Sequence, residues 1–384
     1  MFAYFPLIDI LRFLAAFGVM SFHFFSGSLP GNDPFSIYAR YGYLGVELFF
    51  IISGFVIFFS VGKPFKDYAW GRFLRIYPLF WFLCTITYVA TIVFPHVDHL
   101  SFLLYLKNLL IINDGKVATM IDGSYRTLTV ELFFYAYIGI FTFFFGEKKL
   151  IYFFITWLLV SLITFSGGWQ QLTITKILLV RYAPYFVFGG LLAYFYKHRA
   201  GLTKKIKYFI FAGIGLAALL PYYISAVLNN NPASTPTNHF GMFDRTGNAI
   251  VFSFFVLVPL SVYFSQKITK KSWLKVAKVV GGVTYPLYLI HNKLGGLIIG
   301  ESYGRIASIS VFTAGGMIIA CIFISIYEEK FRKYLKKIIM THYNKKNAEP
   351  EIVSSTESFP LSASALPKSL QPDLVSIEVG EEEK

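Results

Sequence analysis

Apolar residues in this chain come in long continuous runs rather than in alternation with polar residues. A helix needs about 20 residues to cross a bilayer, and continuous runs favour helices over barrel strands, which alternate between two environments. The pattern therefore predicts ten transmembrane helices. Their expected centres are Ala16, Ile51, Thr85, Ala136, Leu158, Phe186, Leu216, Phe255, Ile290 and Ile318.

Two segments depart from this pattern. The connection that follows the third predicted helix contains LSFLLYLKNLLII, which is too short to span and carries Lys107 near its middle, so it is expected to be interfacial or re-entrant. Near the C-terminus the chain becomes basic and then rich in Ser, Pro and Glu, which is typical of disorder. The sequence thus predicts a transmembrane domain over residues 1–340 and a disordered cytoplasmic tail over residues 341–384.

Composition supports the membrane interpretation. Of the 384 residues, 55% are hydrophobic and only 15% are charged, a combination that water-soluble domains seldom show. Only helices or closed barrels satisfy their backbone in lipid, so the expected fold class is an all-α polytopic membrane protein. Cys84 and Cys321 both lie inside apolar runs, and neither a disulfide framework nor a metal site built on cysteine is predicted.

The net charge of +14 does not indicate a nucleic-acid partner, because the basic residues lie between apolar runs rather than in one patch. If the N-terminus is cytoplasmic, the inner connections hold 16 Lys and Arg residues and the outer ones hold 7. Cytoplasmic loops are enriched in these residues. Both termini are therefore expected in the cytoplasm.

The first predicted helix, IDILRFLAAFGVMSFH, carries Asp9, Arg12 and His23. Charged groups inside a membrane are costly and either mark functional sites or form structural pairs. Arg12 and His23 are 11 positions apart, which is about 16 Å along a helix and nearly the same face. This stripe is expected to face the bundle interior or a wet cavity, with Arg12 toward the cytoplasm. The alternative is an interfacial pair of Asp9 with Arg12, and His23 as a satisfied core group.

Other apolar segments also carry polar residues: Glu47 and Ser53 in GVELFFIISGF, Glu131 in LTVELFFY, and Thr284, Tyr288 and His291 in GGVTYPLYLIH. Singly, each has a structural alternative such as core packing. Together they predict two carboxylates and one histidine in the outer half of the membrane, a second histidine at mid-depth, and arginines on the inner side. Such an uneven distribution of polar residues across the membrane favours an enzyme or a transporter.

Six segments from Ile8 to His291 follow one another in an order that resembles the membrane acyltransferase 3 family, whose polytopic enzymes O-acylate bacterial surface glycans. They are IDILRFLAAFGVMSFH, GVELFFIISGF, GRFLRIYPLF, LTVELFFY, RYAPYFVFGGLLA and YPLYLIH. The resemblance covers about residues 5 to 335. Where the family usually has Trp-Ser-Leu ahead of the glutamate, this chain has Arg126, Thr127 and Leu128.

The resemblance implies an acyl-coenzyme A donor on the cytoplasmic side, by family habit acetyl-CoA, with no metal. It implies a glycan or lipid-linked sugar acceptor, such as lipopolysaccharide O-antigen or exopolysaccharide, in the lipid of the bacterial inner (cytoplasmic) membrane. Arg72 and Arg75, together with Arg12, are then candidates for binding the donor, because cations hold phosphates. The alternative is that Arg72 and Arg75 are only positive-inside anchors.

His23 is the candidate general base, because imidazole titrates near neutrality. Either Glu47 or Glu131 is expected to orient it, as a carboxylate does in a histidine dyad. Arg12 is expected to place the thioester or to offset developing negative charge, although its depth also permits donor binding. The remaining candidates are expected to contact substrate: Arg181, His291 and Ser53. Direct transfer is preferred to an acyl-enzyme.

The competing interpretation is a transporter or flippase of a glycan or lipid precursor. Such proteins also place Arg, His and Glu inside a bundle, but they typically show internal repeats with broken helices at matching positions. The two halves of this chain share no motif. A purely structural scaffold would leave the six ordered segments unexplained.

Overall fold

The computed structural model describes residues 4–26, 38–94, 101–111, 119–230, 243–299 and 306–347. Within these ranges every regular element is a helix, and seven helices are long and apolar enough to cross a membrane. The protein is thus an all-α polytopic membrane protein, as the sequence predicts. It divides into two compact units, residues 1–336 and 337–384, and the candidate site lies in the first.

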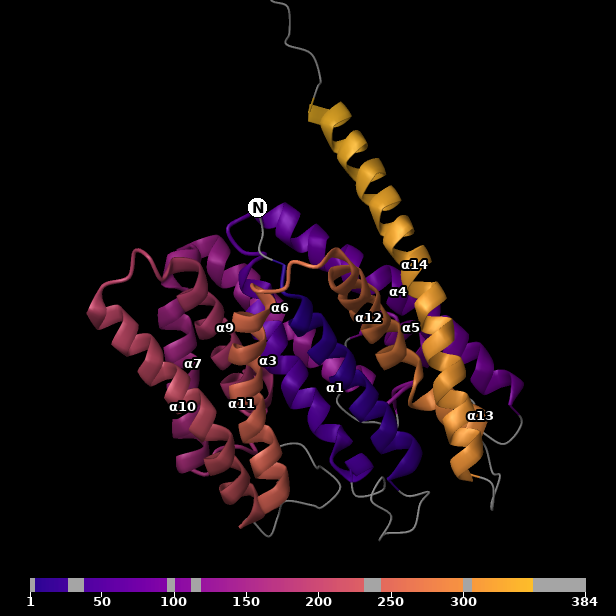
Figure 1. Ribbon diagram of the computed structural model, residues 1–384, viewed down its shortest axis with the longest axis horizontal. Helices are drawn as coiled ribbons and strands as arrows, with labels where there is room; N and C mark the ends of the chain where they lie inside the picture. Colours follow the sequence, from indigo (N-terminus) through magenta and orange to yellow (C-terminus); the bar gives the residue numbers. More distant parts are fainter. Residues whose placement is uncertain are drawn as a thin grey trace, which may run out of the picture. The chain divides into compact units, whose positions relative to one another are not determined.

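Figure 1 shows the helices of this bundle. In chain order they are α1 (Pro6–Phe25), η1 (Gly42–Leu44), α3 (Gly45–Phe58), α4 (Phe65–Val93), α5 (Phe102–Asn108), α6 (Tyr125–Phe145), η3 (Glu147–Lys149), α7 (Leu150–Ser166), α8 (Thr173–Ile177), α9 (Ala183–His198), α10 (Lys204–Asn229), α11 (Arg245–Ser265), α12 (Lys271–Ile290), α13 (Lys293–Ile299) and α14 (Ile306–Asn347).

All ten predicted centres fall within helices, but Ile290 is the last residue of α12 rather than its middle. The predicted position was wrong because α12 begins with Lys271 and carries Lys275 and Lys278 in its first turns, which in the sequence suggest a loop. Long lysine side chains can lie along a helix and keep their charge in water. The count of ten spans and the cytoplasmic location of both termini stay predictions.

The structure agrees to different degrees with the predictions for the two segments that depart from the pattern. The connection around Lys107 forms α5, a helix of seven residues that is too short to span, as predicted. At the other end of the chain, α14 continues to Asn347 and so includes the first seven residues of the predicted tail. The rest of that tail, residues 348–384, lies outside the described residues.

Small residues allow the central helices to approach closely. A Cβ atom on Gly189 of α9 would lie 1.9 Å from the carbonyl oxygen of Ile51 on α3, and one on Gly54 would lie 2.1 Å from that of Phe186. Lipid supplies no hydrophobic drive for helix association, so close van der Waals packing at such positions holds membrane helices together. The α3–α9 pair is therefore fixed by backbone contact.

We expect Gly189→Ala to destabilise the protein by about 1–3 kcal/mol, the usual cost of overpacking, because the added methyl group meets backbone that cannot move aside. The measurement is the melting temperature of the purified protein in detergent. Gly215→Ala in α10 is the control, since a Cβ there meets no atom within 4 Å. Equal melting temperatures for Gly189→Ala and wild type would contradict this packing.

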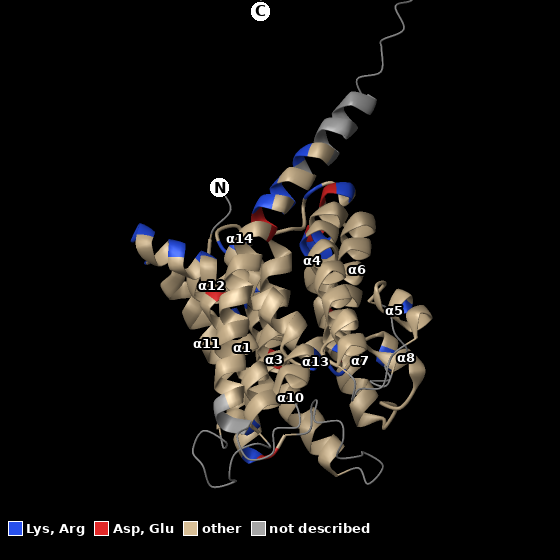
Figure 2. Cartoon of the chain, turned by 90° about the vertical axis from the view of Figure 1, so that its right-hand side faces the viewer, with Lys and Arg blue, Asp and Glu red and all other residues tan. Residues whose placement is uncertain are grey.

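One end of the bundle carries many of the charged groups. At this end, where α1 and α4 begin, Glu147 Oε1 lies 2.5 Å from Lys197 Nζ and 3.6 Å from His198 Nε2. Figure 2 shows basic residues gathered around the beginnings of α4 and α12. These segments include the inner connections expected from the sequence. We call this end inner and the end with His23 outer.

Candidate active site

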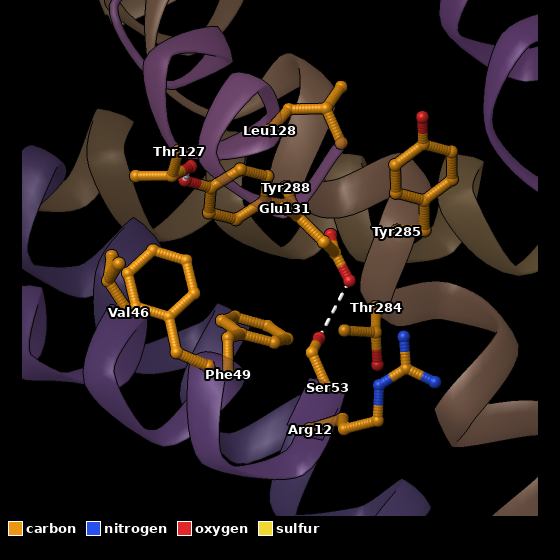
Figure 3. Close-up of a pocket in the computed structure, with 11 residues that line it drawn as sticks. Arg12, Val46, Phe49, Ser53, Thr127, Leu128, Glu131, Thr284, Tyr285 and Tyr288 are labelled. Atoms are coloured by element: carbon orange, nitrogen blue, oxygen red, sulfur yellow. Dashed lines mark hydrogen bonds between the residues drawn. The ribbon is translucent and has the colours of Figure 1, made fainter. Parts of the chain in front are cut away.

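Four helices, α1, α3, α6 and α12, enclose a cavity of about 50 Å³ (Figure 3). Arg12, Ser53, Glu131 and Tyr288 place polar groups on its wall, and much of the remaining wall is apolar. One water molecule needs about 10–15 Å³ of volume measured in this way, so the cavity can hold a few waters or one small group. Polar groups around an enclosed space are typical of binding and catalytic sites.

Glu131 belongs to this cavity and not to the outer end. Its Oε1 accepts a hydrogen bond from Ser53 Oγ at 2.7 Å and another from the Tyr135 hydroxyl. Because α3 runs antiparallel to α1, with Gly45 against Ala15, residues late in α3 lie beside the beginning of α1. The structure therefore groups Glu131 with Ser53 and Arg12 instead of with His23.

Arg12 reaches the cavity from α1, and its guanidinium lies beside Thr284 (Figure 3). Its Nη1 is 4.0 Å from Asp9 Oδ1, and the Arg12 side chain is 18% exposed. The Asp9–Arg12 pair expected from the structural alternative therefore exists, but its distance is at the outer limit for an ion pair. Arg12 retains donors for another group.

The other two predicted donor-binding arginines lie on α4. Arg72 donates from Nη2 to Ser60 Oγ at 2.8 Å, and its guanidinium lies over the Tyr135 ring, 5.4 Å from the centroid. Its Nε and Nη1 are buried and have no hydrogen-bond partner among the described residues. Arg75 interacts electrostatically with both Arg12 and Arg72. We call Arg12, Arg72 and Arg75 the arginine cluster; the unpaired donors of Arg72 suit an anion.

The two predicted histidines meet at the outer end of the site. His23 is exposed near the end of α1, and its ring centroid is 5.2 Å from that of His291. His291 is fully buried, with Nδ1 at 2.9 Å from the Tyr288 carbonyl oxygen and 3.2 Å from that of Leu287. Carbonyl oxygens only accept, so Nδ1 carries the proton of the neutral ring and Nε2 is an acceptor. Within the described chain this Nε2 has no partner.

Glu47 lies elsewhere. It is 2% exposed, its Oε2 has no hydrogen-bond partner in the described part of the chain, and it interacts electrostatically with Arg181. Arg181 and its neighbour Tyr182 directly precede α9, and the Tyr182 ring lies 5.2 Å from that of Phe50 on α3. The structure thus brings Glu47 and Arg181 together, and the described contacts of His23 include neither predicted glutamate.

The carboxylate near the histidines is Asp122, which sequence reasoning missed. Asp122 is 1% exposed and interacts electrostatically with both His23 and His291. It lies just before α6 in the stretch IDGSYR. Asp-Gly is a common turn pair, so the sequence gives no sign that this carboxylate is buried. Only its position beside the end of α12 distinguishes it.

Comparison with known proteins identifies the family of the chain. A family model described as an acyltransferase domain matches residues 5–328. The chain belongs to the acyltransferase 3 family. A protein of Acidianus two-tailed virus named "Putative acetyltransferase ORF330" is 24% identical over 301 residues, which cover 75% of this chain and 82% of the viral protein. No solved structure gives a significant match.

This acyltransferase is therefore a multi-pass membrane enzyme. The structure also shows what replaces the family's Trp-Ser-Leu in this chain. Thr127 occupies the serine position, and its hydroxyl contacts the hydroxyl of Tyr288, which also donates to the Ser124 carbonyl at 3.2 Å. The Tyr288 ring lines the cavity and lies 5.5 Å from the His291 ring. Tyr288 thus connects the cavity with the histidine pair.

Proposed function

We propose that this membrane acyltransferase transfers acetyl from acetyl-CoA to a hydroxyl of a surface polysaccharide or lipid-linked sugar, such as lipopolysaccharide O-antigen or exopolysaccharide, in the bacterial inner membrane. One observation carries the proposal. Polar residues run in a line from the arginine cluster, through the cavity, to the exposed His23. Such a line suits a donor that enters from one side of the membrane and an acceptor that arrives from the other.

The arginine cluster is the expected donor site. Buried guanidinium donors without partners favour a group with several anionic oxygens, and the phosphates of coenzyme A are such groups. Arg12 and His23 are separated by about 16 Å along α1, so Arg12 cannot touch a thioester that lies at His23. This separation favours donor binding by Arg12 over direct stabilisation of the reacting carbonyl. The pantetheine arm of the donor would then occupy an opened form of the cavity.

His23 is the expected base. The acceptor oxygen attacks the thioester carbonyl carbon, its proton passes to His23, and the carbon–sulfur bond breaks to release coenzyme A, whose thiolate takes up a proton. An exposed imidazole is accessible to a glycan hydroxyl from the outer side. Ser53 and Glu131 line the donor's path in this arrangement. Glu47 and Arg181 interact electrostatically near the outer half, and they are the expected polar contacts of the acceptor.

The test uses purified protein in proteoliposomes with radiolabelled acetyl-CoA and surface glycan. We expect ester-linked label on the glycan, released by hydroxylamine, when acetyl-CoA has access to the inner end of the protein. A transporter would instead move the glycan across the membrane without acetyl-CoA and leave no ester. That result would overturn the proposal.

The donor site gives a second expectation. Arg72→Gln should raise the KM for acetyl-CoA by about 10-fold to 100-fold, because one charged hydrogen bond contributes about 1.5–3 kcal/mol. Steady-state kinetics over a range of acetyl-CoA concentrations measures this change. Lys149→Gln is the matched control, an exposed cation in a predicted inner connection. An unchanged KM in both variants would leave Arg72 as a topology anchor only.

A further inference from the structure

We propose that Asp122 is a positioning residue for the outer histidines: it fixes His291 against His23 and supplies the negative charge that stabilises the imidazolium formed when His23 accepts a proton. The inference rests on the proposed acyl transfer and adds a residue that the family's motif segments in this chain do not contain. It follows from the partners of Asp122, from the tautomer of His291, and from the charge that remains on the carboxylate.

Asp122 ties two segments of the chain together. Its Oδ1 accepts from the backbone N–H of Ser124 at 2.8 Å and from Asn292 Nδ2 at 3.0 Å, and its Oδ2 accepts from the backbone N–H of Lys293 at 2.7 Å. Asn292 and Lys293 directly follow His291. The carboxylate therefore holds the turn between α12 and α13 beside the start of α6, and with it the backbone of His291.

This anchoring leaves one nitrogen of His291 available. Its Nδ1 proton is used by the Tyr288 carbonyl, so the neutral ring presents Nε2 as an acceptor, buried and without a partner in the described chain. An unsatisfied buried polar atom is costly and often indicates a functional role. The neighbouring ring is that of His23, so His291 can accept from a protonated His23 or from an acceptor hydroxyl bound there.

The charge of Asp122 is the second contribution. The three hydrogen bonds to the carboxylate from described residues come from neutral N–H groups, so its negative charge is not cancelled by a bound cation among them. Electrostatic interaction with both imidazoles follows from its position. A fixed charge that favours the imidazolium stabilises the step in which the base takes up a proton. A residue with a merely structural role would need the hydrogen bonds but not the charge.

Asp122→Asn removes the charge and keeps the shape and the two hydrogen bonds to Oδ1, and it loses the one from the Lys293 N–H because an amide nitrogen cannot accept. Non-additivity with His291 therefore distinguishes the loss of charge from the loss of this bond. We expect kcat to fall by about 10-fold to 100-fold, as is typical when a carboxylate that orients a metal-binding histidine is lost, with the KM for acetyl-CoA unchanged. The second prediction is non-additivity: in a His291→Ala background the same substitution should cause little further loss, since coupled residues share one effect. Melting temperatures are measured in parallel.

Asp244→Asn is the matched control. Asp244 caps α11, with Oδ1 accepting from the Gly247 N–H at 2.6 Å and Oδ2 from the Tyr41 hydroxyl at 2.6 Å, and its hydrogen-bond partners among the described residues include no histidine. Its kcat should equal that of wild type. If Asp122→Asn does not fold, Asn292→Ala serves instead, because it removes one hydrogen bond to the carboxylate and should lower kcat by a smaller factor that again disappears with His291→Ala.

The outcomes separate the two proposals. A wild-type protein that forms no acetyl ester overturns the proposed function. A wild-type protein that forms the ester, with Asp122→Asn equally active, overturns only the role of Asp122. The same follows if the losses from Asp122→Asn and His291→Ala are additive, or if the loss appears only as a higher KM for acetyl-CoA.

Discussion

Replacing His23 by alanine is expected to remove ester-linked acetyl from surface glycan in cells that contain as much of the variant in their membranes as of the wild type. A positioned general base typically contributes a factor of about 10²–10⁴, so this loss should be the largest among single substitutions. The side chain is exposed at the outer end of α1 and lies beside His291, while the described residues offer it no carboxylate hydrogen-bond partner. Alanine removes the only part of the residue that can take a proton.

The measurement is hydroxylamine-released acetate from purified glycan, compared at matched membrane levels. His198→Ala is the control, since His198 lies at the inner end, where it contacts Glu147 and Tyr194. Acetyl at the wild-type level with His198→Ala and none with His23→Ala supports base catalysis at the outer end. Equal acetyl in all three strains would remove His23 as the base.

Arg12→Gln is expected to raise the KM for acetyl-CoA by about 10-fold to 100-fold, because it removes a charged donor worth about 1.5–3 kcal/mol. The guanidinium lines the cavity and interacts electrostatically with Glu131 and Arg75. Arg12→Lys should recover only part of the affinity, since an ammonium keeps the charge but lacks the planar fork that binds two oxygens at once. Steady-state kinetics with acetyl-CoA varied at saturating acceptor measures both variants.

Asp9→Asn distinguishes this role from a structural pair. If Arg12 serves mainly to neutralise Asp9, the two substitutions should have the same effect. The 4.0 Å separation predicts otherwise: Asp9→Asn should leave the KM for acetyl-CoA near the wild-type value. Equal changes in both variants would support the structural pair and exclude Arg12 from the donor site.

The sequence by itself determined the fold class of the protein and the alignment of two site residues, Arg12 and His23, on one face of a helix. Continuous apolar runs predict helices because lipid requires every backbone group to be satisfied within its own segment, and this is a local property. The 11-residue spacing of Arg12 and His23 likewise follows from the helix alone. The pairing of His23 with His291 was not fixed by the sequence, but the polarity of the ninth segment indicated a candidate.

Tertiary structure decided which groups meet. Glu131 has the same local pattern as Glu47, yet it lies with Ser53, because the antiparallel course of α3 carries that serine to the beginning of α1. The sequence around Asp122 indicates only a turn, and its buried position depends on the residues that follow α12, which hydrogen-bond to it. Helix positions depend on neighbours within a few residues, whereas these contacts join residues from 78 to 171 positions apart. Such contacts are set by how helices pack, which local patterns do not record.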